Sequence, residues 1–157
     1  MKQISTRQLD RLTRDAAASP RRRMNLNLHA DLADPIQRLA IAMQPETYIR
    51  PHRHGQTWEL LTPLRGRFVV LGFDDAGTVI DRLVLGEDAA VSETPALGWH
   101  AMLSLDDGGV ILELKHGPYE PAVEADFAPW SPAPGRSGCA ELMAWYADAA
   151  VGQRWAG

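Results

Sequence analysis

Cysteine, lysine and long apolar runs are scarce in this sequence, and each scarcity excludes a class of protein. Cys139 is the single cysteine, so no disulfide can form within the chain and a reducing compartment is expected. No run approaches the roughly 18–20 apolar residues that a membrane-spanning helix needs. The first residues, Met1 to Arg7, are polar and lack the apolar core of a signal peptide. We therefore expect a cytoplasmic protein without a membrane partner.

Positive charge is also limited. Lys2 and Lys115 are the only lysines, and the formal net charge is −4. A general nucleic-acid-binding protein usually presents a basic face, so this charge argues against that class. The one basic cluster, Arg21 to Arg23, has two interpretations: a solvated loop, which its acidic context favours, or an anion-binding lip over a pocket.

The composition that remains is that of an ordinary globular domain. With 157 residues, 45% hydrophobic and 23% charged, the chain is long enough for one domain with its own core and short for two. We expect a single domain over residues 1–157. It would contain an N-terminal helix over 5–18, a barrel core over about 24–119 and a C-terminal extension over 120–157. The extension is rich in proline and predicts a tail that wraps the barrel, with a short helix from Ala140 to Ala150.

Short apolar or alternating segments dominate the middle of the chain. Separated by Gly, Pro and Asp, they predict about nine strands, over residues 24–29, 37–43, 47–54, 57–63, 67–73, 78–85, 89–93, 99–105 and 110–116. In the strand predicted over 24–29, the alternation of residues would bury Met24, Leu26 and Leu28 and direct His29 outwards. Such a series predicts an all-β antiparallel barrel or sandwich.

The stretch from Arg50 to Gly66 carries the strongest functional signal. Residues i and i+2 of a strand share a face, so His52 and His54 can converge on one point. Glu59 has the wrong parity for an unbroken strand. A turn at Gly55 and Gln56 would let the next strand return its carboxylate to the same point.

A third imidazole, His100, follows a turn-rich stretch that begins at Pro95. Imidazoles and a carboxylate form a ligand set for a divalent metal, with positions left open for water or substrate. The spacing therefore predicts a site for one divalent transition metal. Fe, Mn, Ni, Cu and Zn are all compatible with the ligands His52, His54, Glu59 and His100.

The run His52-x-His54-x4-Glu59-x6-Gly66, with the later His100, resembles the paired metal motifs of the cupin superfamily. Together with the segments over 34–39, 47–54, 114–119 and 126–130, it resembles the WbuC-type cupin-fold metalloproteins over roughly residues 5–135. This resemblance implies a cupin double-stranded β-helix, which is a jelly-roll barrel.

The chain departs from the cupin motifs at three positions. Glu46 stands where the first motif usually opens with glycine. Gly98 stands one place later than the usual glycine of the second motif, and Ser104 stands where asparagine is common. No ligand is lost, but the departures bear on the loop before His100.

Four residues around the predicted metal are candidates for contact with a substrate. If 47–54 is a regular strand, Tyr48 and Arg50 face the metal; alternatively Pro51 breaks the register and leaves Arg50 in solvent. Glu113 and Lys115 share one face of the strand over 110–116. On an inward face they would form a charged pocket for a polyol or carboxylate and assist proton transfer. On an outward face they would be a surface ion pair of little consequence.

The position of Lys115 within a segment that carries the resemblance favours the inward interpretation. Tyr119, three residues after the strand over 110–116, is a candidate for the pocket rim.

Two functions of different classes follow. The first is a metal-dependent enzyme. WbuC-type cupins are associated with surface-polysaccharide biosynthesis, so the resemblance implies a sugar or nucleotide-sugar substrate. The reaction would be an isomerisation or epimerisation at a Lewis-acid metal, with Fe(II) oxygenase chemistry as a rival. The second is a non-catalytic, metal-dependent module that binds a small ligand. The resemblance also implies a homodimer, since cupin barrels commonly pair through their sheets.

Overall fold

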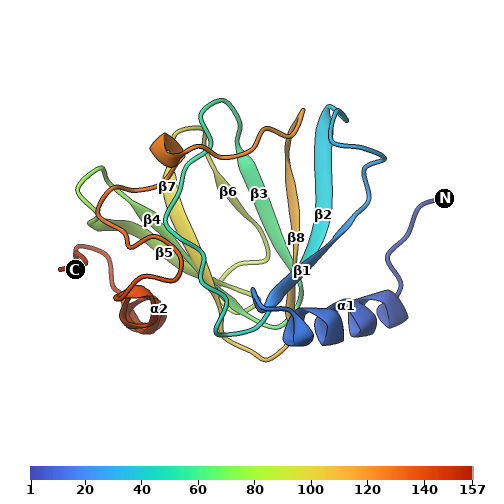
Figure 1. The fold of residues 1–157 in the computed structure, drawn as a ribbon, viewed down its shortest axis with the longest axis horizontal. Coiled ribbons are helices and arrows are strands. Elements are labelled where there is room, and N and C mark those ends of the chain that lie inside the picture. Colours follow the sequence, from blue (N-terminus) through green and yellow to red (C-terminus); the bar gives the residue numbers. More distant parts are fainter. Residues whose placement is uncertain (157) are drawn as a thin grey trace.

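A computed structural model of the chain describes residues 1–156, whose strands form two antiparallel sheets (Figure 1). The larger sheet contains, in spatial order, β1 (Arg23–Asn27), β2 (Ile36–Met43), β8 (Gly109–His116), β3 (Glu59–Arg65) and β6 (Ser92–Thr94). The smaller sheet contains β5 (Val79–Leu85), β4 (Phe68–Phe73) and β7 (Trp99–Ser104). The predicted all-β jelly roll with terminal helices is confirmed.

Helix α1 (Thr6–Ala18) covers the outer face of the larger sheet (Figure 1). Its start is fixed by a capping box, in which Ser5 and Gln8 exchange hydrogen bonds between side chain and backbone. Leu12 and Ala16 are buried against Ala40, Ala42 and Val110 of the sheet, together with Leu26 of β1. No helix within residues 1–156 has the length and apolarity needed to cross a membrane.

The sheets are covered on both faces, which explains their nearly continuous apolar strands. On β4, Phe68 and Val70 belong to the core between the two sheets, whereas Val69 and Leu71 belong to an outer core. Helix α2 (Cys139–Asp148) supplies that outer core with its buried Leu142 and Tyr146. The inner and outer faces of β4 are therefore both apolar, and only the alternation of residues distinguishes them.

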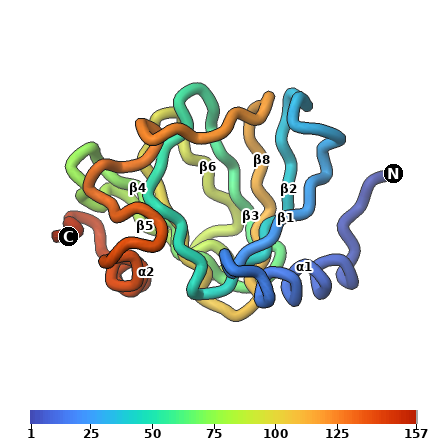
Figure 2. The backbone as a smooth tube through the Cα atoms, in the orientation of Figure 1, coloured from blue at the N-terminus to red at the C-terminus, as the bar shows by residue number. Residues whose placement is uncertain are grey.

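The C-terminal extension crosses one rim of the barrel before it reaches α2 (Figure 2). It contains the short 3-10 helix η1 (Glu124–Asp126) and lies beside the segment that precedes β3. The Arg53 N–H donates to the Asp126 carbonyl, and the Ala128 N–H donates to the Pro51 carbonyl, each at 2.9 Å.

Three local predictions are wrong. Residues 47–54 do not form a regular strand: only His52 makes bridges, one to His100 and one to Phe127. The strand predicted over 89–93 is β6, which spans Ser92–Thr94. On β1 the inner face is the polar one, so His29 is buried and Met24 is largely exposed. The outer face of β1 packs on α1 through Leu26, whereas Met24 of the same face is not covered.

Candidate metal centre and the cavity around it

The four predicted metal ligands come together inside the barrel. His52, His54, Glu59 and His100 each offer one ligand atom, and these four atoms lie within 4.8 Å of one another. The Nε2 atom of His54 is 3.1 Å from Oε1 of Glu59, and Nε2 of His100 is 3.1 Å from Oε2 of the same carboxylate. Residues up to 48 positions apart in the sequence thus face one small volume.

The backbone explains how this convergence arises. His52 lies on the irregular segment that follows β2 and exchanges two backbone hydrogen bonds with His100 of β7, at 2.9 and 2.8 Å. The chain bends at Gly55 and Gln56, so Glu59 at the start of β3 points back towards the two imidazoles. The turn inferred from the parity of Glu59 is therefore present.

Backbone carbonyls orient two of the imidazole rings. Nδ1 of His52 is 2.9 Å from the Arg50 carbonyl, and Nδ1 of His100 is 2.9 Å from the Gly98 carbonyl. A carbonyl can only accept, so both Nδ1 atoms carry the proton and donate it. The Nε2 atoms are then left with free lone pairs, which is the arrangement found for histidines that bind metals.

Burial and neighbouring charges set the protonation states of His52 and Glu59. Burial, and then the neighbouring His100, lower the pKa of His52 to about 3, so this ring is neutral at neutral pH. Burial acts to raise the pKa of Glu59, but contact with His100 and His54 holds it well below its usual value. Glu59 is therefore a carboxylate, as a metal ligand must be.

Two unsatisfied buried atoms show that the cluster fits a metal ion. Oε2 of Glu59 and Nε2 of His100 are buried and have no hydrogen-bond partner, although they are 3.1 Å apart, because both are acceptors when the His100 proton is on Nδ1. Unsatisfied buried polar atoms are costly, and a shared cation would satisfy both. The cluster could hold one divalent metal ion through three imidazoles and one carboxylate.

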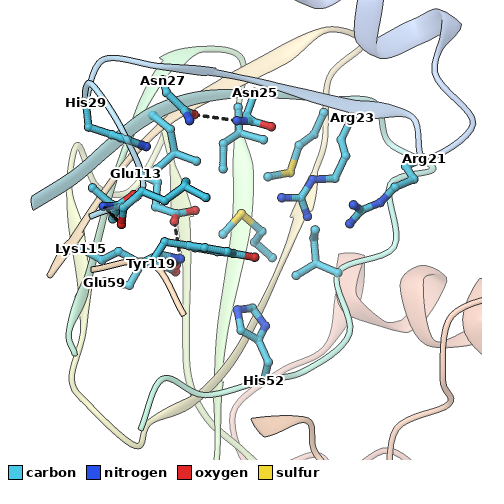
Figure 3. Close-up of a pocket in the computed structure, with 17 residues that line it drawn as sticks. Arg21, Arg23, Asn25, Asn27, His29, His52, Glu59, Glu113, Lys115 and Tyr119 are labelled. Carbon is cyan, nitrogen blue, oxygen red and sulfur yellow. Dashed lines mark hydrogen bonds and ion pairs between the residues drawn. The ribbon is translucent and has the colours of Figure 1, made fainter. Parts of the chain in front are cut away.

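A cavity of about 350 Å³ opens beside the cluster, between the two sheets (Figure 3). Its apolar part includes Ile41, Met43, Ile49 and Met102. Its polar part is larger and comprises Arg21, Arg23, Asn25, Asn27, His29, Gln37, His52, Glu59, Glu113, Lys115 and Tyr119. A cavity of this size and polarity suits a small hydrophilic molecule.

Glu113 and Lys115 face inwards from β8, next to the cluster. Nζ of Lys115 is 2.7 Å from Glu113 and 4.0 Å from Oε1 of Glu59. Burial, and then the charge of Glu59, raise the pKa of Glu113. Burial acts to lower the pKa of Lys115, but the two carboxylates outweigh it and raise the pKa overall. An acid–base pair thus lies within reach of anything bound at the cluster.

Of the other three residues predicted to contact a substrate, one lines the cavity and two do not. Tyr119 lines the cavity, at the position expected for a rim residue. Tyr48 and Arg50 do not line it, which corrects their expected orientation. The Tyr48 hydroxyl donates to the Pro132 carbonyl, and Arg50 is buried under the C-terminal extension. The irregular backbone of 47–54 removes the strand parity on which that expectation depended.

Sequence reasoning missed the β1 side of the cavity. Arg23, Asn25 and Asn27 alternate along β1 and face inwards, followed by the buried His29 (Figure 3). The signal was present in the strict alternation of this strand, but polar residues were assigned to solvent. The same side contains Arg21, so two arginines of the basic cluster line the cavity, Arg23 from β1 and Arg21 from an exposed turn.

The loop before His100 has an unusual backbone at Leu97. Its φ is +67°, a left-handed conformation that favours glycine, and it occupies the place where the cupin motif has its glycine. The Leu97 N–H donates to the His54 carbonyl at 2.8 Å. This hydrogen bond links the loop that precedes His100 to the backbone of His54, so it connects two candidate metal ligands.

Comparison with protein families gives one match. A family model described as "Domain of unknown function (DUF6016)" matches residues 4–85, which is more than half of the chain. The chain belongs to this family. No curated protein matches it.

Solved structures similar to this DUF6016 member share its fold at low sequence identity. TT1209 from Thermus thermophilus matches with a TM-score of 0.55 and 14% identity, over 74% of this chain and 97% of that one. KdgF from Halomonas sp. matches with a TM-score of 0.50 and 14% identity, over 66% of this chain and 84% of that one. An oxalate oxidase in complex with the substrate analogue glycolate matches with a TM-score of 0.52 and 15% identity, over 68% of this chain and 56% of that one. These likenesses show the cupin-type jelly roll alone.

Proposed function

We propose that this protein is a metal-dependent cupin enzyme that isomerises or epimerises a small hydroxylated metabolite, with a sugar as the leading substrate class. The observation that carries the proposal is the convergence of three imidazoles and a carboxylate within 4.8 Å, at the wall of a polar cavity. The resemblance to WbuC-type cupins supports a sugar and a role in surface-polysaccharide biosynthesis.

The cavity supports a substrate of monosaccharide size. Its volume of about 350 Å³ is near the lower limit for small-molecule sites. A nucleotide-sugar would insert only its sugar and leave the nucleotide at the mouth. Asn25 and Asn27 supply amide groups that can donate to and accept from hydroxyls.

The residues beside the cluster can move a proton. A divalent ion bound by the four ligands would act as a Lewis acid and polarise a substrate carbonyl or hydroxyl. Glu113 would remove a proton beside that oxygen and return it to a neighbouring position or to the other face. Lys115, 2.7 Å from Glu113, would hold the carboxylate in place and balance its charge. The proton is returned, so the reaction needs no oxidant or other co-reactant.

Metal analysis tests the first part of the proposal. Purified protein reconstituted with Mn, Fe, Ni, Cu or Zn and then desalted should retain about one ion per chain of at least one of these metals. Glu59→Gln and His100→Ala should lose it, because each removes a ligand from a four-member set. His116→Ala is the matched control, since His116 is exposed and outside the cluster. Wild-type protein that retains none of the metals would overturn the proposal.

Turnover tests the second part. Metal-loaded protein would be incubated in D2O with aldoses, ketoses and nucleotide-sugars, and deuterium incorporation followed by NMR. Glu113→Gln and Lys115→Met should keep the metal and lose at least about 100-fold in rate, as expected for removal of a general acid–base group. Oxygen-dependent turnover would favour the Fe(II) oxygenase instead. Tight binding without turnover would favour the non-catalytic module.

A further inference from the structure

Two arginines line the cavity, and neither has an acidic partner. Among residues 1–156, neither the Arg21 nor the Arg23 guanidinium lies within 4.0 Å of a carboxylate, whereas nine other side chains of Lys, Arg or His do. Figure 3 shows both guanidinium groups directed into the cavity, across from Glu59, Glu113 and Lys115. Two like charges that share a cavity repel each other, so this arrangement costs stability unless something binds between them.

The middle arginine of the same run behaves differently. Arg22 has a φ of +55° and leaves the cavity. It forms an ion pair with Glu46 at 3.4 Å and donates to the Ala17 carbonyl at the end of α1. Arg22 lies in the turn between α1 and β1, and the residues on either side of it line the same cavity. Arg22 thus has a structural partner, and its two neighbours do not.

The total charge around the cavity is positive in a protein that is negative overall. Three cationic side chains, Arg21, Arg23 and Lys115, face two carboxylates, Glu59 and Glu113. A divalent ion at the cluster would increase this excess by two, whereas the whole chain has a net charge of −4. Lys115 is already paired with Glu113, so the excess lies at the arginine end. Such a field concentrates anions.

The rest of the β1 side offers hydrogen bonds. Asn27 and Asn25 follow Arg23 on the inner face of β1, and Asn25 donates to Asn27 at 2.7 Å. His29, 6% exposed, has its Nδ1 beside the Arg38 backbone, 2.9 Å from the N–H and 3.0 Å from the carbonyl oxygen. Its Nε2 is buried and has no partner. Figure 3 shows the ring of His29 directed towards the cavity, where Nε2 can form a hydrogen bond with a ligand.

We propose that the ligand of this cavity is a polyhydroxylated oxyanion, whose carboxylate or phosphate is bound by Arg21 and Arg23 while its hydroxyls lie along β1 towards the metal cluster. The inference rests on the proposed function only in placing the ligand in the same cavity. Arginine suits this role because its planar guanidinium binds carboxylates and phosphates through two parallel hydrogen bonds.

A matched ligand series tests the proposal. Glucitol, gluconate and glucitol 6-phosphate share a six-carbon polyol and differ in bearing no anion, a carboxylate or a phosphate. Calorimetric titration of wild-type protein, with and without the reconstituted metal, should show at least one anion binding about 10-fold or more tightly than glucitol. The preferred anion identifies the headgroup. Equal binding of all three ligands, or no binding of either anion, would overturn the proposal.

Three single substitutions assign the effect to residues. Arg21→Gln and Arg23→Gln should each weaken binding of the preferred anion about 10-fold or more and leave glucitol unchanged. Arg22→Gln is the matched control and should bind like wild type. Unchanged anion binding in both Arg21→Gln and Arg23→Gln would overturn the proposal.

Thermal unfolding separates a binding role from a structural one. Removal of one of two unpaired like charges should keep or raise the Tm of ligand-free Arg23→Gln, and the anion should raise the Tm of wild type more than that of the variant. A lower Tm with an unchanged shift by the anion would identify a structural arginine and contradict the proposal. Metal content is measured separately, so failure of the metal site and failure of the anion site give different results.

Discussion

At the scale of single residues, hydrogen bonds to the backbone decide what each histidine can do. His52 and His100 donate from Nδ1 to carbonyls two residues earlier, which leaves Nε2 free for a metal. In His29, Nδ1 contacts the Arg38 backbone and the partnerless Nε2 faces the cavity. Histidine therefore serves as a candidate metal ligand in the cluster and as a candidate substrate contact at His29.

Leu97 allows a prediction about backbone strain. A left-handed conformation costs a non-glycine residue about 1–2 kcal/mol, and glycine gives back roughly 0.5–1 kcal/mol through its more flexible unfolded state. Leu97→Gly should therefore raise the free energy of unfolding by up to about 1 kcal/mol, measured by urea denaturation. Gly98→Ala is the contrasting variant. Its Cβ would lie 3.0 Å from Cγ2 of Thr94, so it should destabilise the protein. A destabilised Leu97→Gly would show that the side chain contributes more than its strain costs.

At the scale of elements, the irregular segment over 44–58 is held between β7 and the C-terminal extension. Arg50 is its main link to the extension: Nε donates to the Ser131 hydroxyl at 3.0 Å, and the guanidinium pairs with Glu124 and lies 5.0 Å from the Phe127 ring centre. The extension thus packs against the segment that contains two of the candidate metal ligands, His52 and His54.

Loss of this link should loosen the extension without removing the metal. Arg50→Met should lower the free energy of unfolding by about 1–3 kcal/mol, since it removes charged hydrogen bonds from a buried side chain. Limited proteolysis should then cut first within residues 117–138. Glu124→Gln is the control: its carboxylate is exposed, so the change should be about 0.5 kcal/mol or less. Loss of metal from Arg50→Met at full stability would instead place Arg50 in the site.

A second inter-element link predicts a pH dependence. Asp106, after β7, accepts hydrogen bonds from the Arg67 guanidinium and backbone at the start of β4. The bond from the Arg67 side chain is the main reason that the pKa of Asp106 is lowered. A lowered pKa stabilises the fold above the unfolded value near 3.8, and this contribution is lost as the pH falls through the folded pKa.

The comparison of Asp106→Asn with wild type measures that contribution. The variant should have a lower Tm at pH 7, and the difference in Tm should shrink between pH 4 and pH 2.5. Asp107→Asn is the control, because Asp107 forms no ion pair within the described chain. A Tm difference that does not change with pH would exclude the Arg67 pair as its cause.

At the scale of the whole molecule, the metal cluster joins both sheets: His100 lies on the smaller sheet and Glu59 on the larger. An ion bound there should stabilise the native state by mass action. At a free concentration 100 times Kd, the gain is about 2.7 kcal/mol, or roughly 5–10 °C in Tm for a chain of this length. EDTA should reverse this shift, and Glu59→Gln should lose most of it. An unchanged wild-type Tm would contradict a metal held between the sheets.

The expected homodimer stays a prediction, to be measured by light scattering of the purified protein. Trp145 of α2 packs on Trp155 and Phe73 of its own chain, and both tryptophans stay partly exposed.

The sequence by itself determined the strand-rich fold and both helices, because residue alternation, capping residues and turn residues are local properties. It also identified the four candidate ligands, although the strand over 47–54 from which the pairing of His52 and His54 was inferred is not formed. The turn at Gly55 and Gln56 was enough to return Glu59 to the histidines. The tertiary structure alone decided which face of each strand is inside. Since the outer face of β1 packs on α1 through Leu26, Arg23 and His29 face the cavity. Local alternation records two faces but does not say which one a distant helix will cover.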